Sequence, residues 1–185
     1  MRNLASQIPL RRELIPLWPS STLNRISVRA TLASSRVITM LPSSPQVKSV
    51  YSQIMSVLQK LDAGLTSETL FIDSTTLDVD IARGIASDVV NAGAHMVDAP
   101  VSGGTQFVRR LLNTNCNIFC SGVSGAKAGT LSFLVGGTEE VFQVSQPILS
   151  LMGERIIYCG PSGSGLAAKI CNNVSYRSVL KITVK

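Results

Sequence analysis

The sequence is poor in the residues that metal sites, disulfide frameworks and membrane spans require. Its 185 residues include one histidine, His95, and four scattered cysteines, Cys116, Cys120, Cys159 and Cys171. This set is too small and too irregularly spaced for a secreted disulfide framework or a zinc site, so we expect a reducing compartment and no metal. No apolar, uncharged run reaches the roughly 18 residues of a membrane-spanning helix, and we expect no membrane partner. The hydrophobic content of 45% suits a globular α/β protein.

Acidic residues are also scarce, and they are unevenly distributed. The net charge is +6, yet residues 37–104 and 123–173 together hold six basic and ten acidic residues. The positive excess lies outside these ranges, above all in residues 1–36, which hold six arginines and one acid. Because the part of the chain that is patterned like a folded domain is acidic, we expect no nucleic-acid partner.

Residues 1–36 contain no glycine and show neither helical nor strand periodicity. Their arginine-rich and serine-rich composition is typical of an organellar transit peptide, which predicts a mitochondrial location. A basic leader of another origin, or an aberrant N-terminus, is an equally good interpretation and leaves a cytoplasmic location open.

From residue 37 onward, apolar patterning predicts strands that alternate with helices. Strands are expected at residues 37–41, 69–73, 95–99, 130–135 and 155–158, and helices at 47–61, 80–92 and 138–151. Thr138 is expected to cap the last of these helices, and another helix is expected to follow the turn at Gly160–Gly163. This alternation favours an α/β fold with a partial Rossmann-like parallel sheet and flanking helices.

The helix after that turn carries two polar residues suited to chemistry. Lys169 and Asn173 lie four residues apart and therefore on one helical face. Lysines on helices are most often solvated surface charges. Here the neighbours of Lys169 are mainly apolar, so burial should lower its pKa, as a general acid or base near neutral pH requires.

A second candidate is the glycine-rich segment Asp98–Gly104, which overlaps the end of a predicted strand. The Ser102 hydroxyl and the backbone N–H groups of Gly103 and Gly104 could bind a carboxylate or a phosphate. Glycine-rich strand ends are also common as plain turns, so this segment alone does not decide between the two interpretations.

Five segments, taken together and in sequence order, carry a family resemblance. They are Ile38–Ser44, Phe71–Thr76, Asp98–Gly104, Gly129–Gly137 and Gly163–Asn173. In this order they resemble the β-hydroxyacid dehydrogenases, in particular the 3-hydroxyisobutyrate dehydrogenases. In the related 6-phosphogluconate dehydrogenases, a His-Asn pair follows the lysine where this chain has Cys171-Asn172-Asn173. The hydroxyisobutyrate branch therefore fits better.

The resemblance implies an oxidoreductase of valine catabolism. Such an enzyme moves a hydride between NAD, with NADP not excluded, and the hydroxyl-bearing carbon of a small hydroxy acid. The resemblance implies that Lys169 transfers the proton of the substrate hydroxyl and that Asn173 orients this hydroxyl. It further implies that Ser102, Gly103 and Gly104 hold the substrate carboxylate.

Four positions match residues that line the cofactor in the family. They are Leu41, Pro42, Gln46 and Thr76, although Gln46 stands where the family has asparagine.

The chain departs from the family in three places. Its N-terminal part has no Gly-x-Gly-x-x-Gly turn to grip the pyrophosphate of a dinucleotide, so we expect the first βαβ unit of the sheet to be missing. Residues 105–122 interrupt the match as an insertion. After Asn173 the family continues into a long all-helical domain that forms a homodimer, whereas this chain ends twelve residues later.

These expectations divide the chain into three segments. Residues 1–36 form a basic leader, residues 37–160 a partial dinucleotide-binding domain, and residues 161–185 the start of a truncated all-helical domain. The alternative to an enzyme is a non-catalytic, incomplete family member that acts at most as an interaction protein.

Overall fold

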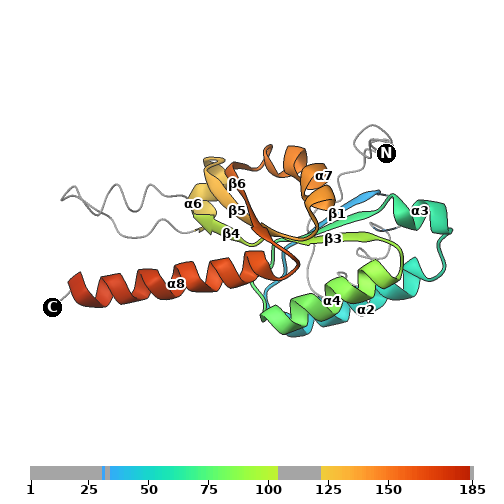
Figure 1. The fold of residues 1–185 in the computed structure, drawn as a ribbon, viewed down its shortest axis with the longest axis horizontal. Helices are drawn as coiled ribbons and strands as arrows, with labels where there is room; N and C mark the ends of the chain where they lie inside the picture. The colour runs from blue at the N-terminus through green and yellow to red at the C-terminus, as the bar shows by residue number, and fades with distance from the viewer. Residues whose placement is uncertain (1–30, 32–33, 104–121, 184–185) are drawn as a thin grey trace.

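The strands and helices follow one another in the predicted alternation (Figure 1). The computed structural model describes residues 31, 34–103 and 122–183. Its strands are β1 (Arg36–Thr39), β2 (Leu70–Asp73), β3 (His95–Asp98), β4 (Val101–Gly103), β5 (Leu131–Gly136) and β6 (Gly153–Gly160). Its helices are α2 (Ser44–Leu58), α3 (Ala63–Ser67), α4 (Val79–Asn91), α6 (Gly122–Lys127), α7 (Glu139–Leu149) and α8 (Ser164–Thr183). Every predicted strand and helix is present with somewhat shifted ends, whereas α3, β4 and α6 were not predicted.

The beginnings of α7 and α8 follow from their local sequences. Thr138 caps α7, as predicted, because its hydroxyl accepts a hydrogen bond of 3.4 Å from the backbone N–H of Val141. Before α8, the chain turns through Gly160 and Gly163, whose φ angles are 113° and 84°. Residues with a side chain rarely adopt this left-handed conformation, so the two glycines allow the turn.

One sheet contains all six strands, and its order is β1-β2-β3-β5-β4, with β6 also paired to β5. The strands β1, β2 and β3 are parallel, and Thr39, Asp73 and Asp98 lie in register at their carboxyl ends. β5 runs antiparallel to β3 and β4 and parallel to β6. The predicted Rossmann-like parallel arrangement is thus confirmed, and the antiparallel pairing of β5 is an addition to it.

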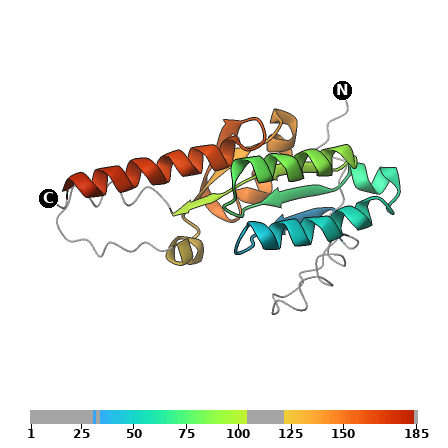
Figure 2. The same cartoon turned by 90° about the horizontal axis from the view of Figure 1, so that it is seen from below.

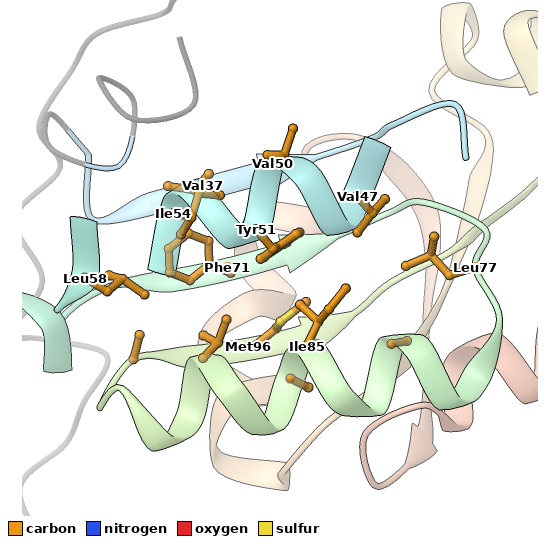
Figure 3. Close-up of a cluster of buried hydrophobic side chains, with 14 of the residues drawn as sticks. Val37, Val47, Val50, Tyr51, Ile54, Leu58, Phe71, Leu77, Ile85 and Met96 are labelled. Carbon is orange, nitrogen blue, oxygen red and sulfur yellow. The ribbon is translucent and has the colours of Figure 1, made fainter. Parts of the chain in front are cut away.

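Helices pack on both faces of the sheet (Figures 1 and 2), and each face has its own apolar core. Successive side chains of a strand face opposite sides, so Phe71 belongs to one core and its neighbours Leu70 and Ile72 to the other. The first core, between α2, α4 and the parallel strands (Figure 3), includes Val37, Val47, Tyr51, Ile54, Phe71, Leu77, Ile85 and Met96. The second, beneath α7, includes Leu70, Ile72, Val97, Phe133, Val135 and Leu149.

Helix α8 begins at the sheet and then extends away from it toward the C-terminus (Figure 1). Leu166 in its first turn is fully buried in the first core. Lys169 is half-buried, and Asn173 and Val174 are exposed. The part of α8 that lies closest to the sheet therefore carries Lys169.

Some predictions fall on residues that the structure does not describe. Gly104, residues 105–121 and most of residues 1–36 lie outside the described ranges. Within those ranges, no helix has the length and apolar character that a membrane crossing needs. The same described residues include no cluster of histidine, cysteine and carboxylate side chains that could hold a metal ion.

Candidate active site

The loops that carry most of the predicted site residues leave the sheet at one edge, the one formed by the carboxyl ends of the parallel strands. They follow the carboxyl ends of β1 and β2, and the chain after β3 leads directly into β4 and Ser102. Ligands of open α/β sheets bind outside this edge. The loops that carry Leu41, Pro42 and Thr76, and the chain that leads to Ser102, therefore all follow the carboxyl ends of the parallel strands.

A buried hydrogen-bond network fixes the loops after β1 and β2. The Thr39 hydroxyl donates to Asp73 Oδ1 at 3.1 Å, and therefore accepts from the Tyr51 hydroxyl at 2.9 Å. The backbone N–H of Thr75 donates to the same Asp73 oxygen at 3.0 Å, and Thr75 Oγ1 accepts from the backbone N–H of Leu41 at 2.9 Å. Burial raises the pKa of Asp73, while the hydrogen bonds from Thr75 and Thr39 oppose the rise. Leu41 is thus held against the loop that contains Thr76.

The predicted cofactor residues differ in exposure. Leu41 is partly buried against the first core, whereas Pro42, Gln46 and Thr76 are exposed. Gln46 lies in the first turn of α2, where its side-chain oxygen accepts a hydrogen bond from the Ser43 hydroxyl. Exposed groups on adjacent loops can contact a ligand without any rearrangement of the core.

Ser74 is a residue of this edge that sequence reasoning missed. Its side chain is 4% exposed, and its hydroxyl has no hydrogen-bond partner among the described residues. A buried hydroxyl without a partner is unusual because its desolvation is uncompensated. Ser74 lies two residues before Thr76, a predicted cofactor residue, and is therefore a candidate ligand contact. The only hint of this in the sequence was its place in the Phe71–Thr76 motif.

Lys169 has the environment that the sequence predicted. It is half-buried on α8, and burial lowers the pKa of its amine from the ordinary lysine value. A lowered pKa increases the fraction of neutral amine, which is the form that can accept a proton. The structure thus gives Lys169 a lowered pKa in the direction that the sequence predicted.

The structure joins α8 to the strand that carries Ser102. The side-chain amide of Asn172 donates to Ser102 Oγ, with 3.4 Å between the two atoms. The sequence pointed instead to Asn173, which is exposed and whose role stays a prediction. Residues three and four apart on a helix both share a face, so the spacing from Lys169 alone could not separate Asn172 from Asn173. Gly103 is the last residue of β4, directly after Ser102.

A second link between the same two segments is Asp98, which is 5% exposed at the end of β3. Its Oδ1 accepts from the backbone N–H of Gly163 at 2.7 Å, and its Oδ2 accepts from that of Leu166 at 3.0 Å. Burial raises the pKa of Asp98, and these backbone hydrogen bonds oppose the rise. In the sequence, Asp98 was notable only as the first residue of the Asp98–Gly104 motif.

Comparison with known families decides the classification. The model of the NAD binding domain of 6-phosphogluconate dehydrogenase matches residues 21–160. The chain belongs to this family. The match includes part of the segment interpreted above as a leader, and it spans residues 105–122.

Relatives of this NAD-binding-domain family member include 3-hydroxyisobutyrate dehydrogenases from several organisms. The mitochondrial enzyme of Mus musculus is 40% identical over 141 residues, which are 76% of this chain and 36% of the mouse protein. A probable mitochondrial 3-hydroxyisobutyrate dehydrogenase of Arabidopsis thaliana is 41% identical over 152 residues, covering 77% of this chain and 38% of its own length. The chain thus spans little more than a third of these curated relatives.

A solved structure shows the same fold. The 3-hydroxyisobutyrate dehydrogenase of Mycobacterium tuberculosis, solved with L-serine, is 36% identical with a TM-score of 0.64. The match covers 80% of this chain and 43% of that one. The predicted resemblance to 3-hydroxyisobutyrate dehydrogenases is confirmed by these matches.

Proposed function

We propose that the chain carries the proton-transfer and substrate site of an oxidoreductase of the 3-hydroxyisobutyrate dehydrogenase type. Such a protein moves a hydride between a nicotinamide cofactor and the hydroxyl-bearing carbon of a small hydroxy acid. The observation that carries the proposal is the hydrogen bond from Asn172 to Ser102, which joins the helix that carries Lys169 to the strand that carries Ser102. The identity of 40% to the mouse enzyme supports it.

The cofactor would lie against the loops after β1 and β2. Leu41, Pro42, Gln46 and Thr76 would contact it, and three of these four side chains are exposed at that edge. The hydroxyl of Ser74, which has no partner in the described part of the chain, fits the same group, because a bound ligand would supply a hydrogen bond. When bound, NAD or NADP supplies the hydride acceptor. The matched family, a NAD binding domain, favours NAD.

Lys169 would exchange the proton of the substrate hydroxyl. Its neutral amine accepts this proton as the alcohol is oxidised, and its ammonium returns the proton in the reverse direction. Because burial lowers the pKa of Lys169, the rate of alcohol oxidation should rise with pH through that lowered pKa and level off below the ordinary value of 10.5. A pH profile of kcat/KM measures this.

Ser102 would hold the substrate carboxylate, together with the amides of Gly103 and Gly104. Since Ser102 Oγ already accepts a hydrogen bond from Asn172, its own proton is free to be donated to a carboxylate oxygen. Asn173, exposed one position further along α8, would orient the substrate hydroxyl. The site thus selects small hydroxy acids with a free carboxylate.

A mitochondrial location belongs to the same proposal. Two observations support it, the arginine-rich composition of residues 1–36 and the mitochondrial names of the mouse and Arabidopsis relatives. A homodimer, which the resemblance implies for the complete family member, belongs to the same proposal.

The experiment is a rate measurement on the purified 185-residue chain. We expect reduced nicotinamide to form from NAD and 3-hydroxyisobutyrate, and far less of it from 6-phosphogluconate. Lys169→Met should lower turnover about 10²- to 10⁴-fold without weakening NAD binding. Lys60→Met, which changes an exposed lysine in the turn that follows α2, is the matched control.

Two results would contradict the proposal. One is an absence of binding at millimolar NAD and NADP, which would favour the alternative of a non-catalytic interaction protein. The other is a Lys169→Met variant that turns over substrate as fast as the Lys60→Met control.

A further inference from the structure

The candidate site is assembled from two segments that are distant in the sequence, and both meet at one buried carboxylate. Asp98 ends β3, and four residues later the chain reaches Ser102. Both of its oxygens accept hydrogen bonds from the start of α8, Oδ1 from Gly163 and Oδ2 from Leu166. Lys169 follows Leu166 by three residues, which is less than one helical turn.

This carboxylate is not an ordinary helix cap. The first N–H groups of a helix have no partner within it, and a residue just before the helix usually supplies the acceptor. In α4 that residue is Asp78, which accepts from the N–H groups of Asp80 and Ile81 at 2.9 and 3.3 Å. In α8 the acceptor lies on a strand 65 and 68 residues away from its donors. The two hydrogen bonds therefore fix the helix to the sheet and also give its first N–H groups an acceptor.

Two glycines pack tightly against the Asp98 carboxylate. A Cβ atom on Gly136 would lie 2.5 Å from Asp98 Oδ1, and one on Gly165 would lie 2.8 Å from Oδ2. Both distances are far below ordinary contact, so β5 and α8 touch the carboxylate only because these positions lack side chains. The negative charge also sits at the positive end of the α8 dipole, where anions are stabilised.

We propose that Asp98 is the positioning residue of this site: by holding the first turn of α8 against the end of β3, its carboxylate sets where Lys169 lies relative to Ser102. The roles of Lys169 and Ser102 rest on the proposed function, whereas the placement of α8 by Asp98 does not. Asp98 acts through the helix and does not itself contact the reacting groups.

The first test uses the wild-type chain of 185 residues and measures hydrogen exchange of its backbone amides by NMR. Amides in the first turn of an uncapped helix exchange quickly because they lack an internal acceptor. We expect Gly163 and Leu166 to be protected, and Asp98→Asn to speed their exchange roughly tenfold or more, since a charge-assisted bond is lost. Fast exchange of both amides in the wild type overturns the proposal, even if no variant folds.

The second test reads the amine of Lys169 directly. Acetylation by dilute acetic anhydride, followed by peptide mass mapping across a pH series, reports the pKa of each lysine, with exposed Lys48 and Lys60 as internal references. In Asp98→Asn, a released α8 lets water reach Lys169, so we expect its pKa to rise toward the ordinary value. Asp78→Asn is the matched control, because it changes the cap of α4, and it should leave Lys169 unchanged.

The sign of the shift separates the explanations. If Asp98 acted on Lys169 only through its charge, loss of the negative charge would lower the pKa of the amine. If Asp98 were merely structural, the melting temperature would fall and the pKa of Lys169 in the folded protein would not move. Either result overturns the proposal. Neither test needs cofactor or turnover, so a failure of the proposed enzymatic function is detected separately.

Discussion

The two halves of the sheet are held together in different ways. Around β1, β2 and β3, the contacts are mainly apolar, and α2 and α4 pack on the strands that they connect. Where β4, β5 and α8 meet, polar contacts join residues far apart in the sequence, with Asp98 bound to Leu166 and Asn172 bound to Ser102. The first half is a set of local units, and the second is a junction.

This difference predicts which substitutions disturb the proposed site and which disturb the fold. A hydrogen bond contributes about 0.5–1.5 kcal/mol net, and about 1.5–3 kcal/mol when one partner is charged. Two or three such bonds and one buried side chain, that of Leu166, place α8, whereas many buried apolar side chains place α2 and α4. Single substitutions at the junction should therefore disturb the proposed site while the fold persists. Substitutions in the first core should mainly lower the free energy of unfolding.

The largest effect is expected in the core of the parallel half. Phe71 is fully buried there, with its ring centroid 6.2 Å from that of Tyr51. Phe71→Ala should lower the free energy of unfolding by about 3–5 kcal/mol, because a large cavity is left. Phe142→Ala, which removes a partly buried ring of the other half, should cost clearly less in urea unfolding. Equal losses would show that the two halves are packed alike.

The next effect compares the two helix caps. Asp98→Asn should lower the free energy of unfolding by about 1.5–3 kcal/mol, since the buried carboxylate loses its charge and one of its two acceptor atoms. Asp78→Asn should stay within about 0.5 kcal/mol, because asparagine caps a helix as well as aspartate does. Thermal unfolding of both variants measures the difference. Matching losses would mean that the long-range cap is no stronger than the local one.

A third comparison uses two glycines and predicts opposite signs. A methyl group on Gly136 would meet the Asp98 carboxylate, so Gly136→Ala should destabilise the protein by about 1–3 kcal/mol. Gly84 is exposed within α4 and has open space around it, so Gly84→Ala should stabilise by about 0.5–1 kcal/mol. Chemical denaturation distinguishes them. A neutral Gly136→Ala would remove the claim of tight packing at the junction.

The smallest effect on stability is expected for two exposed asparagines, which should differ in their effect on KM. Asn172 donates to Ser102 Oγ and Asn91 to Ser87 Oγ, at 3.4 and 3.5 Å. Replacement of either by alanine should change the free energy of unfolding by at most about 0.5 kcal/mol. Only Asn172→Ala should raise KM for the hydroxy acid, because only Ser102 belongs to the proposed substrate site. An equal KM for the two variants would remove Asn172 from substrate binding.

The sequence predicted the parallel half well and the junction poorly, for a physical reason. The spacing of Val47, Tyr51 and Ile54 encodes an apolar helical face, and such periodicity is a local property. The direction of β5 is not encoded by periodicity, so its antiparallel pairing was not foreseen. The anchoring of α8 by Asp98 was not foreseen either, because its donors lie 65 residues or more further along.

The site itself was foreseen in part. Apolar neighbours correctly indicated that burial lowers the pKa of Lys169. The spacing on α8 allowed both Asn172 and Asn173, and only the placement of β4 singles out Asn172 as the partner of Ser102. Likewise, nothing local to Ser74 indicated that its hydroxyl would be buried without a partner among the described residues.

Acetylation of Lys169 with and without ligands tests the central claim, that Lys169 and Ser102 line one ligand site. NADH and 3-hydroxyisobutyrate can be added together because both are reduced and cannot react with each other. The account predicts that this pair slows acetylation of Lys169 markedly and leaves the exposed Lys60 unchanged. Acetylation of Lys169 at the same rate with and without the two ligands would contradict it.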